Sequence, residues 1–212
     1  DYFSEIPRGA EVVRTLAKED PITKPITAKA YDSNIQIPAV VAAYRMPSIK
    51  TRDSRVLDMI SAYLTDGNSS KLYRKMVDEE KMALQVGAFN VSQEDYGMYL
   101  IFGLPLGDTP LRSIISGIDE EVVKIQKELI SEKDYQKLQN KFEANFVDSN
   151  SSVEGIANSL AEYYAFFGET NLINSEIEIY RSISREEIQE VAKKYLNPNQ
   201  RLVLDYLPES SK

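Results

Sequence analysis

Apolar segments that end at turn residues recur in the first half of the chain. Residues 23–32 alternate loosely between apolar and polar side chains, and residues 35–46 are rich in Val, Ile and Ala, so both predict strands. Residues 83–91 and 98–104 flank a turn at 93–97 and predict an antiparallel hairpin. A last apolar run at 201–206 predicts a closing strand.

Apolar residues at helical spacing fill most of the remaining chain. The predicted helices are 51–64, 69–81, 111–129, 131–148, 153–167, 174–182 and 184–195. A hydroxyl side chain is expected to cap the start of the first helix at Thr51 and of the second at Ser69 or Ser70. Four aromatic residues that end the 153–167 helix are expected in the core: Tyr163, Tyr164, Phe166 and Phe167.

The order of these elements predicts the fold class and the domain boundaries. Strands and helices are segregated instead of alternating, which favours an α+β fold with a largely antiparallel sheet and helices packed on one face. Residues 1–22 are irregular and contain proline, so they are predicted to be a linker or strap from a preceding domain. Residues 23–208 are predicted to form a single domain, and residues 209–212 a polar tail.

Composition narrows the possible partners. The chain has 212 residues, 42% of them hydrophobic, and a formal net charge of −8. An acidic chain without a Lys/Arg cluster argues against a nucleic-acid partner. The longest apolar run, residues 37–44, is too short to span a bilayer, and the first residues lack a signal-peptide layout. These first residues resemble an internal segment of a longer protein.

The chain contains neither cysteine nor histidine. It therefore has no disulfide framework, no Ser-His-Asp triad and no thiolate or imidazole ligand for a metal. The carboxylate runs at 79–80 and 119–121 are expected to be solvated helix faces. The residues alone predict an α+β domain without a visible catalytic set, and no catalytic or metal-binding residue is predicted.

Three segments carry a family resemblance. DGNSSKLYRKMVDEEKMALQVGA, residues 66–88, resembles the glycine-x-Ser-Ser-Arg-Leu, helix, Leu-Ala-Tyr-x-Val signature of the insulinase-like zinc metallopeptidases. That group includes pitrilysin and the mitochondrial processing peptidase. ELISEKDYQKLQNKF, residues 128–142, is similar to the start of a family helix, and residues 182–208 are similar to its closing helix and strand. The resemblance covers nearly the whole chain.

The resemblance implies a protein made of two homologous halves. One half of such a protein carries a His-x-x-Glu-His motif, in which zinc polarises the peptide carbonyl and the glutamate activates water. The other half holds no metal and helps to enclose the substrate. A chain without histidine resembles the metal-free C-terminal half of a bacterial-type member. No cofactor is expected in this chain, and zinc is expected in the N-terminal half.

The same resemblance suggests partners and a compartment. The expected partners are the protein's own N-terminal zinc-bearing half, a homologous sister chain and a peptide substrate, with neither nucleic acid nor membrane. A soluble protein of the bacterial periplasm or cytoplasm is expected.

Two positions are candidates for the substrate wall. Some metal-free halves carry an Arg on the 69–81 helix and a Tyr on the following strand, and both reach the substrate. The matching positions here are Val77 and Leu84, which cannot donate a hydrogen bond to an oxyanion. An exposed apolar or tyrosine-rich patch is also expected on the sheet face opposite the helices, near Tyr44, Tyr96 and Tyr99.

Two functions fit these expectations. The first is a non-catalytic C-terminal domain that forms one wall of the peptide chamber of a zinc metalloendopeptidase. The second is a structural or assembly subunit of the same fold with no proteolytic role. A His-x-x-Glu-His motif in the sequence that precedes this segment would favour the first.

Overall fold

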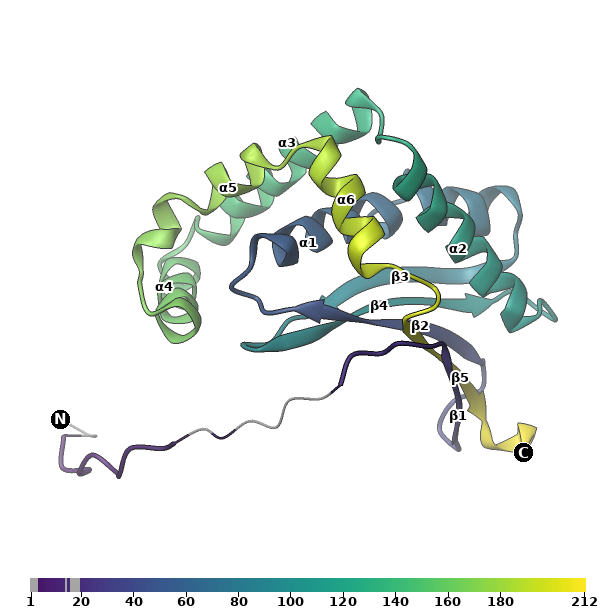
Figure 1. The fold of residues 1–212 in the computed structure, drawn as a ribbon, viewed down its shortest axis with the longest axis horizontal. Helices are drawn as coiled ribbons and strands as arrows, with labels where there is room; N and C mark the ends of the chain where they lie inside the picture. The colour runs from purple at the N-terminus through teal and green to yellow at the C-terminus, as the bar shows by residue number, and fades with distance from the viewer. Residues whose placement is uncertain (1–3, 14, 16–19) are drawn as a thin grey trace.

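One five-stranded sheet organises the molecule (Figure 1). The computed structural model describes residues 4–13, 15 and 20–212. The strands lie in the order β1-β5-β2-β4-β3, and only β1 and β5 are parallel. Their bounds are β1 Ile26–Asp32, β2 Ala39–Pro47, β3 Ala83–Val91, β4 Tyr96–Pro105 and β5 Arg201–Pro208. The hairpin predicted from the sequence is the pair β3 and β4.

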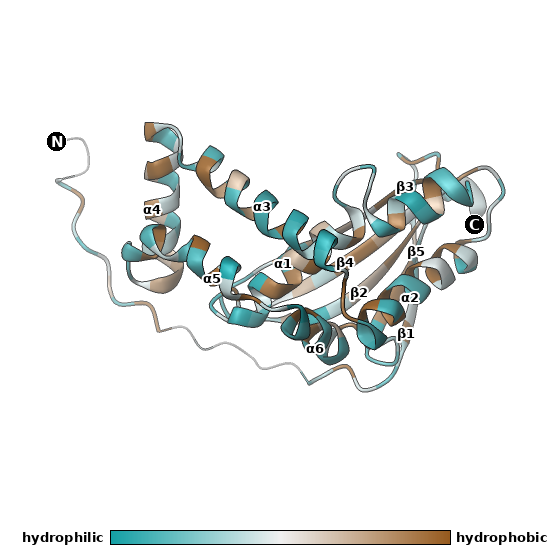
Figure 2. Ribbon diagram, turned by 90° about the horizontal axis from the view of Figure 1, so that it is seen from above, coloured by the Kyte–Doolittle hydropathy of each residue, from teal (hydrophilic) through white to brown (hydrophobic). Residues whose placement is uncertain are grey.

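Helices cover one face of this sheet (Figures 1 and 2). The helices α1, α2 and α6 pack against the strands, while α3 and α5 pack against α1 and each other. The bounds are α1 Arg52–Thr65, η1 Tyr73–Glu79, α2 Leu111–Lys127, α3 Glu132–Ser149, α4 Val153–Phe167, η2 Asn171–Asn174, α5 Glu176–Ser182, α6 Arg185–Tyr195 and η3 Glu209–Ser211. The α+β prediction with helices on one face is confirmed. None of the helices described is both long and apolar enough to cross a bilayer.

Hydroxyl caps fix where several helices begin. Thr51, Ser131 and Ser152 each accept a hydrogen bond from a backbone amide in the first turn of α1, α3 and α4. Ser184 and Glu187 form a reciprocal capping box at the start of α6. These bonds satisfy amides that have no partner inside the helix.

The helix that follows Gly67 differs from its prediction. Residues 73–79 form a π-helix, η1, in which the amide of Glu80 donates to the carbonyl of Lys75, 2.8 Å away. The predicted serine cap is wrong. The Ser70 hydroxyl has no partner, and the Ser69 hydroxyl accepts a hydrogen bond from the Lys137 ammonium instead.

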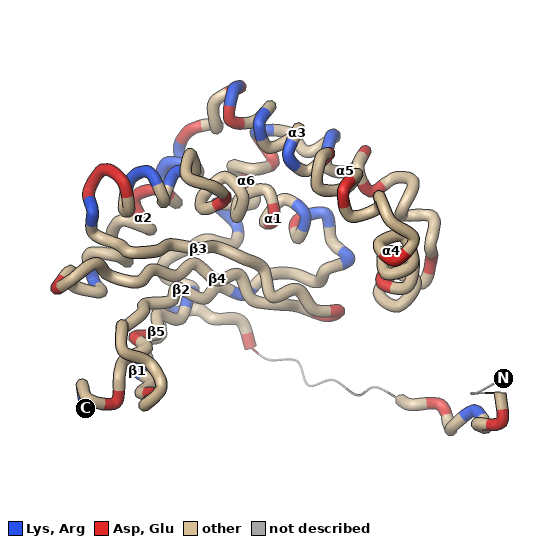
Figure 3. The backbone as a smooth tube through the Cα atoms, turned by 180° about the vertical axis from the view of Figure 1, so that it is seen from behind, with Lys and Arg blue, Asp and Glu red and all other residues tan. Residues whose placement is uncertain are grey.

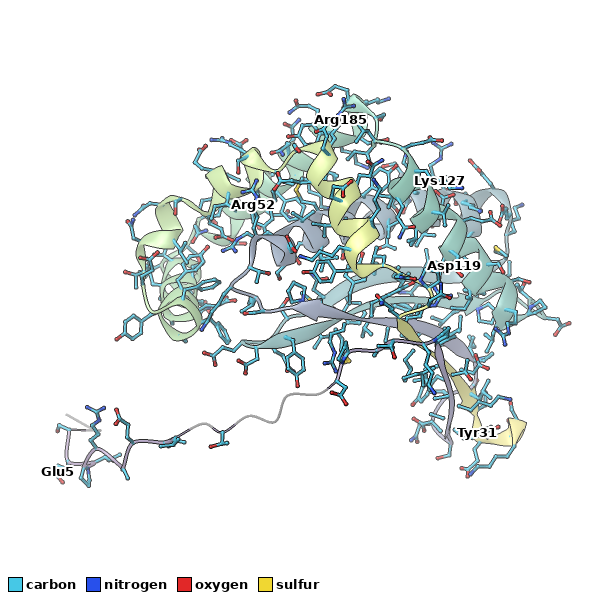
Figure 4. The ribbon with its side chains drawn as sticks, viewed as in Figure 1. Glu5, Tyr31, Arg52, Asp119, Lys127 and Arg185 are labelled. Atoms are coloured by element: carbon cyan, nitrogen blue, oxygen red, sulfur yellow. The ribbon has the colours of Figure 1, made fainter. Side chains whose placement is uncertain are left out.

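The predicted tyrosine patch is wrong for two of its three members. Tyr44 and Tyr99 are fully buried, and their rings pack edge to face between the sheet and the helices. Arg201 donates to the Tyr44 hydroxyl at 2.8 Å and also binds the carboxylate of Asp119, which Figure 4 labels. This buried group ties β5 to β2 and α2. Tyr96 points to the other face of the sheet.

The predicted burial of the α4 aromatic residues is also wrong. No residue of α4 is fully buried, and Tyr164 is 67% exposed. The close neighbour of α4 among the described elements is η2, so α4 stands away from the sheet (Figures 1 and 2). Its apolar side chains have no core to enter. We call residues 153–182, which comprise α4, η2 and α5, the arm.

Candidate functional site

The sheet face that points away from the helices is broad and apolar. Alternation along β2 and β4 turns one set of side chains to the core and the other set to this face. We call it the open sheet face; its residues are Val41, Ala43, Arg45, Phe89, Val91, Tyr96, Met98, Leu100, Phe102, Leu104, Leu202 and Leu204. The helices described lie on the opposite side (Figure 1). Figure 3 shows that charged residues gather on helices and loops, and that the central strands carry few.

Aromatic rings organise the middle of the open sheet face. Phe89 and Phe102 contact edge to face with ring centroids 6.2 Å apart. The Phe102 ring lies over Gly87, where a Cβ atom would come within 2.2 Å of it. Glycine at position 87 therefore lets the ring lie flat on the backbone. Phe89 is 44% exposed and Met98 48% exposed, so the apolar face is open to contact.

A hollow of about 340 Å³ lies at one end of this face. Its walls include Ala43 from β2, Met98 from β4 and Leu202 from β5, and Ile22 closes it from the segment that precedes β1. Arg45 also lines it, with its guanidinium 4.8 Å from the centroid of the Tyr96 ring. The hollow therefore suits an apolar side chain.

The structure places the two substrate-wall candidates on neighbouring elements. Val77 lies in η1, half-buried against the core, and Leu84 lies at the start of β3. The two elements pack against each other. Leu84 sits where the register shifts between Ala83 and Gln85 and is 45% exposed. Neither side chain carries a hydrogen-bonding group.

The outer edge of β3 is partly blocked. The amide of Ala88 points away from β4 and donates to the hydroxyl of Thr65 on α1, 2.9 Å away. A peptide strand that paired along β3 would have to displace this hydroxyl. The open sheet face is thus the less obstructed binding surface of the hairpin.

The side chains in this region can bind but offer no catalytic set. Among the described residues, no group of three or more acidic side chains is placed to hold a metal ion. The one charged member of the open sheet face is Arg45. Apolar contact and shape are what this face can contribute.

Comparison with known proteins identifies the family. The model of the family described as "Peptidase M16 inactive domain" matches residues 1–142. The chain belongs to the peptidase M16 inactive-domain family. It is 25% identical to the zinc protease PqqE of Helicobacter pylori over 137 residues. The aligned segment covers 65% of this chain and 31% of PqqE.

Solved structures share the fold. A protease from Helicobacter pylori superposes with a TM-score of 0.86 at 20% identity, over 94% of this chain and 48% of that one. The inactive peptidase domain of a predicted zinc protease from Bordetella parapertussis gives a TM-score of 0.73 at 21% identity, over 81% of this chain and 92% of that one. The matched segments therefore cover 31% of PqqE, 48% of the solved Helicobacter pylori protease and nearly all of the Bordetella domain.

Sequence reasoning missed which residues of β4 reach the open sheet face. Both faces of this strand are apolar, so alternation does not separate them. Glycine does carry a signal. Gly97 and Gly103 share the parity of Tyr99, and a Cβ at Gly103 would lie 2.5 Å from the Ile114 side chain. The close approach of α2 at Gly103 marks the helix-facing side of the strand.

Proposed function

We propose that this chain is the non-catalytic C-terminal domain of a zinc metalloendopeptidase. It forms one wall of the peptide-binding chamber and supports hydrolysis by a separate zinc-bearing domain. The observation that carries the proposal is the open sheet face, a wide apolar surface on a domain of the inactive family. Large exposed apolar surfaces are typical of interaction sites.

Two surfaces fit the preceding half of the protein. The open sheet face is one, and α4 is the other, with Val153 86% exposed. Residues 4–13 are exposed and lead away from the sheet on the side of α4 (Figure 1). A half joined to this segment would lie beside both surfaces. Burial of their apolar side chains would then stabilise the assembly.

The substrate would meet this domain through apolar contact. Val77 and Leu84 border the sheet where relatives of the family place polar groups, and they offer only surface here. Closing a chamber excludes water and fixes the peptide near the zinc. A homologous sister chain would supply the hydrogen-bond donors that these positions lack.

Zinc would be held outside this chain. With no histidine or cysteine, the chain lacks the imidazole and thiolate ligands on which most zinc sites depend. The zinc-bearing half would supply the Lewis acid and the general base. This chain's own part is to bind and orient the peptide and to exclude water.

The test joins the two halves. The N-terminal half of the full-length protein is expressed separately and mixed with this chain, and association and cleavage of a fluorogenic peptide are measured. We expect a complex with chelator-sensitive activity that neither half shows alone. If the intact protein is an active protease but its halves neither associate nor gain activity together, the chamber-wall role is wrong. A complex without activity, from an intact protein that is also inactive, would select the structural-subunit alternative.

A further inference from the structure

A partly buried carboxylate joins the arm to the body of the domain. Asp58 on α1 accepts a hydrogen bond from the Asn90 amide on β3 at 2.5 Å and another from the Tyr180 hydroxyl on α5 at 3.1 Å. The Tyr180 ring in turn stacks on Phe142 of α3, with centroids 4.6 Å apart. Four elements therefore meet around one carboxyl group.

Asp58 has no cation of its own. Arg55, one turn earlier on α1, donates two hydrogen bonds to Glu176 on α5, at 2.8 and 2.9 Å. That ion pair is neutral as a unit and leaves Asp58 without a counter-ion. The titratable and charged groups around Asp58 are Arg55 on α1, Glu176 and Tyr180 on α5 and Tyr99 on β4. Lys141 of α3 and Asp66 line the adjacent hollow and form an ion pair with each other.

The buried acceptor atoms around Asp58 outnumber the donors by one. The Oδ1 atom of Asn90 is buried and has no hydrogen-bond partner. The two carboxylate oxygens take the donors from Asn90 and Tyr180, so this third acceptor is left over. A proton on Asp58 would add one donor to this group of buried polar atoms.

The surroundings of Asp58 favour the neutral acid. Burial raises the pKa of Asp58 to about 6, against the opposing effect of its hydrogen bonds from Tyr180 and Asn90. The chain has no histidine, the side chain that ordinarily titrates in this range. A hollow of about 280 Å³, lined by Asp58, Ser61 and Phe142, lies next to the carboxyl group.

We propose that the protonation state of Asp58 sets how firmly the arm is held against α1. The protonated carboxyl completes the hydrogen bonds among α1, β3 and α5. The ionised carboxylate regains hydration when α5 lifts away, so ionisation makes local opening of the arm more frequent. The group acts at neutral pH and requires neither zinc nor substrate.

Native-state hydrogen exchange tests this device on the 212-residue chain. Protection of the α5 amides, corrected for intrinsic exchange, is compared at about pH 5 and about pH 7.5. We expect this protection to fall about tenfold. That is the change in the opening equilibrium for a carboxyl whose pKa is near 6 when the arm is closed and near 4 when the arm is open. The α6 amides belong to the body and exchange through global unfolding, so they should be better protected than the α5 amides at both pH values.

Two variants and one titration decide the outcome. Asp58→Asn should abolish the pH dependence of α5 protection, and Asp66→Asn, on the same hollow, should keep it. A pH-independent wild type, or a fall that persists in Asp58→Asn, would overturn the proposal. Carbon-detected NMR of the wild-type Asp58 carboxyl gives a check that needs no variant. An apparent pKa near the ordinary ~4 would contradict it.

Discussion

The guanidinium of Arg55 on α1 donates two hydrogen bonds to the carboxylate of Glu176 on α5, at 2.8 Å from Nε and 2.9 Å from Nη2. Both side chains are largely shielded from solvent. Arg52 adds a more exposed connection at the far end of α5, with a 2.9 Å bond to the Ser182 hydroxyl (Figure 4). The arm is thus joined to the body by polar contacts near both ends of one short helix.

Glu176→Gln should destabilise the domain by about 3 kcal/mol, because it leaves a buried guanidinium without its charge partner. Urea unfolding followed by circular dichroism measures the change. Glu178→Gln is the matched control, since Glu178 makes an exposed pair with Arg181 on the same helix. That control should change stability by less than ~0.5 kcal/mol. Equal effects of the two substitutions would show that the Arg55 pair is no more than a surface contact.

Gly103→Ala should cost about 1–3 kcal/mol through overpacking. The new methyl group would approach the Ile114 side chain to 2.5 Å, so α2 would have to move away from β4. Gly9→Ala serves as the control, because a Cβ at Gly9 meets nothing within 4 Å. Thermal unfolding of both variants checks the prediction, and a Gly103→Ala protein as stable as the wild type would mean that α2 adjusts freely.

Met98→Asp should weaken association with the N-terminal half at least about tenfold, because it places a charge on the open sheet face, beside its hollow. The domain itself should lose less than about 1 kcal/mol, since Met98 is already half exposed. Leu129→Asp is the control, a comparably exposed apolar residue between α2 and α3. Titration calorimetry separates the two variants. Equal affinity for both would place the interface somewhere other than this face.

Asp58 should make the domain less stable as the pH rises. The pKa of its carboxyl is about 6 in the folded chain, above its ordinary value in the unfolded chain, so the folded state binds the proton more tightly. Stability from this group is fully present below about pH 4 and is lost as the pH passes through 6. The loss amounts to about 2 kcal/mol between about pH 4 and pH 8. Subtracting the urea-unfolding pH profile of Asp58→Asn from that of the wild type isolates this contribution, and a flat difference would refute it.

The local pattern of the sequence was enough for the elements and the fold class. Strand β3 spans the predicted residues 83–91, and the Thr51 hydroxyl caps its helix as expected. Each of these features depends on a few neighbouring residues. The π-helical hydrogen bonding of η1 cannot be predicted in this way. Its buried residue Met76 and the preceding buried residue Leu72 are spaced as they would be in an α-helix.

The environment of an element was harder to predict than its existence. Tyr44 and Tyr99 lie on strands that are apolar on both faces, so the sequence does not say which face receives the helices. The apolar residues of α4 predicted burial in the core, but Tyr163, Phe166 and Phe167 are only half-buried and Tyr164 is exposed. Asp58 became noticeable only once the fold had brought Asn90 and Tyr180 to it from distant segments.

The parallel pairing of β1 with β5 sets the order in which the sheet can be completed during synthesis. Strand β1 emerges from the ribosome long before β5, its one partner among the described strands, and the bond from Tyr206 to Asp32 spans 174 residues. β5 also fills the place between β1 and β2, so a nascent chain that ends before Arg201 leaves both of those strands with an open edge. Such a chain has a slow final step and a surface that chaperones would bind. The domain is closed only when its C-terminal strand arrives.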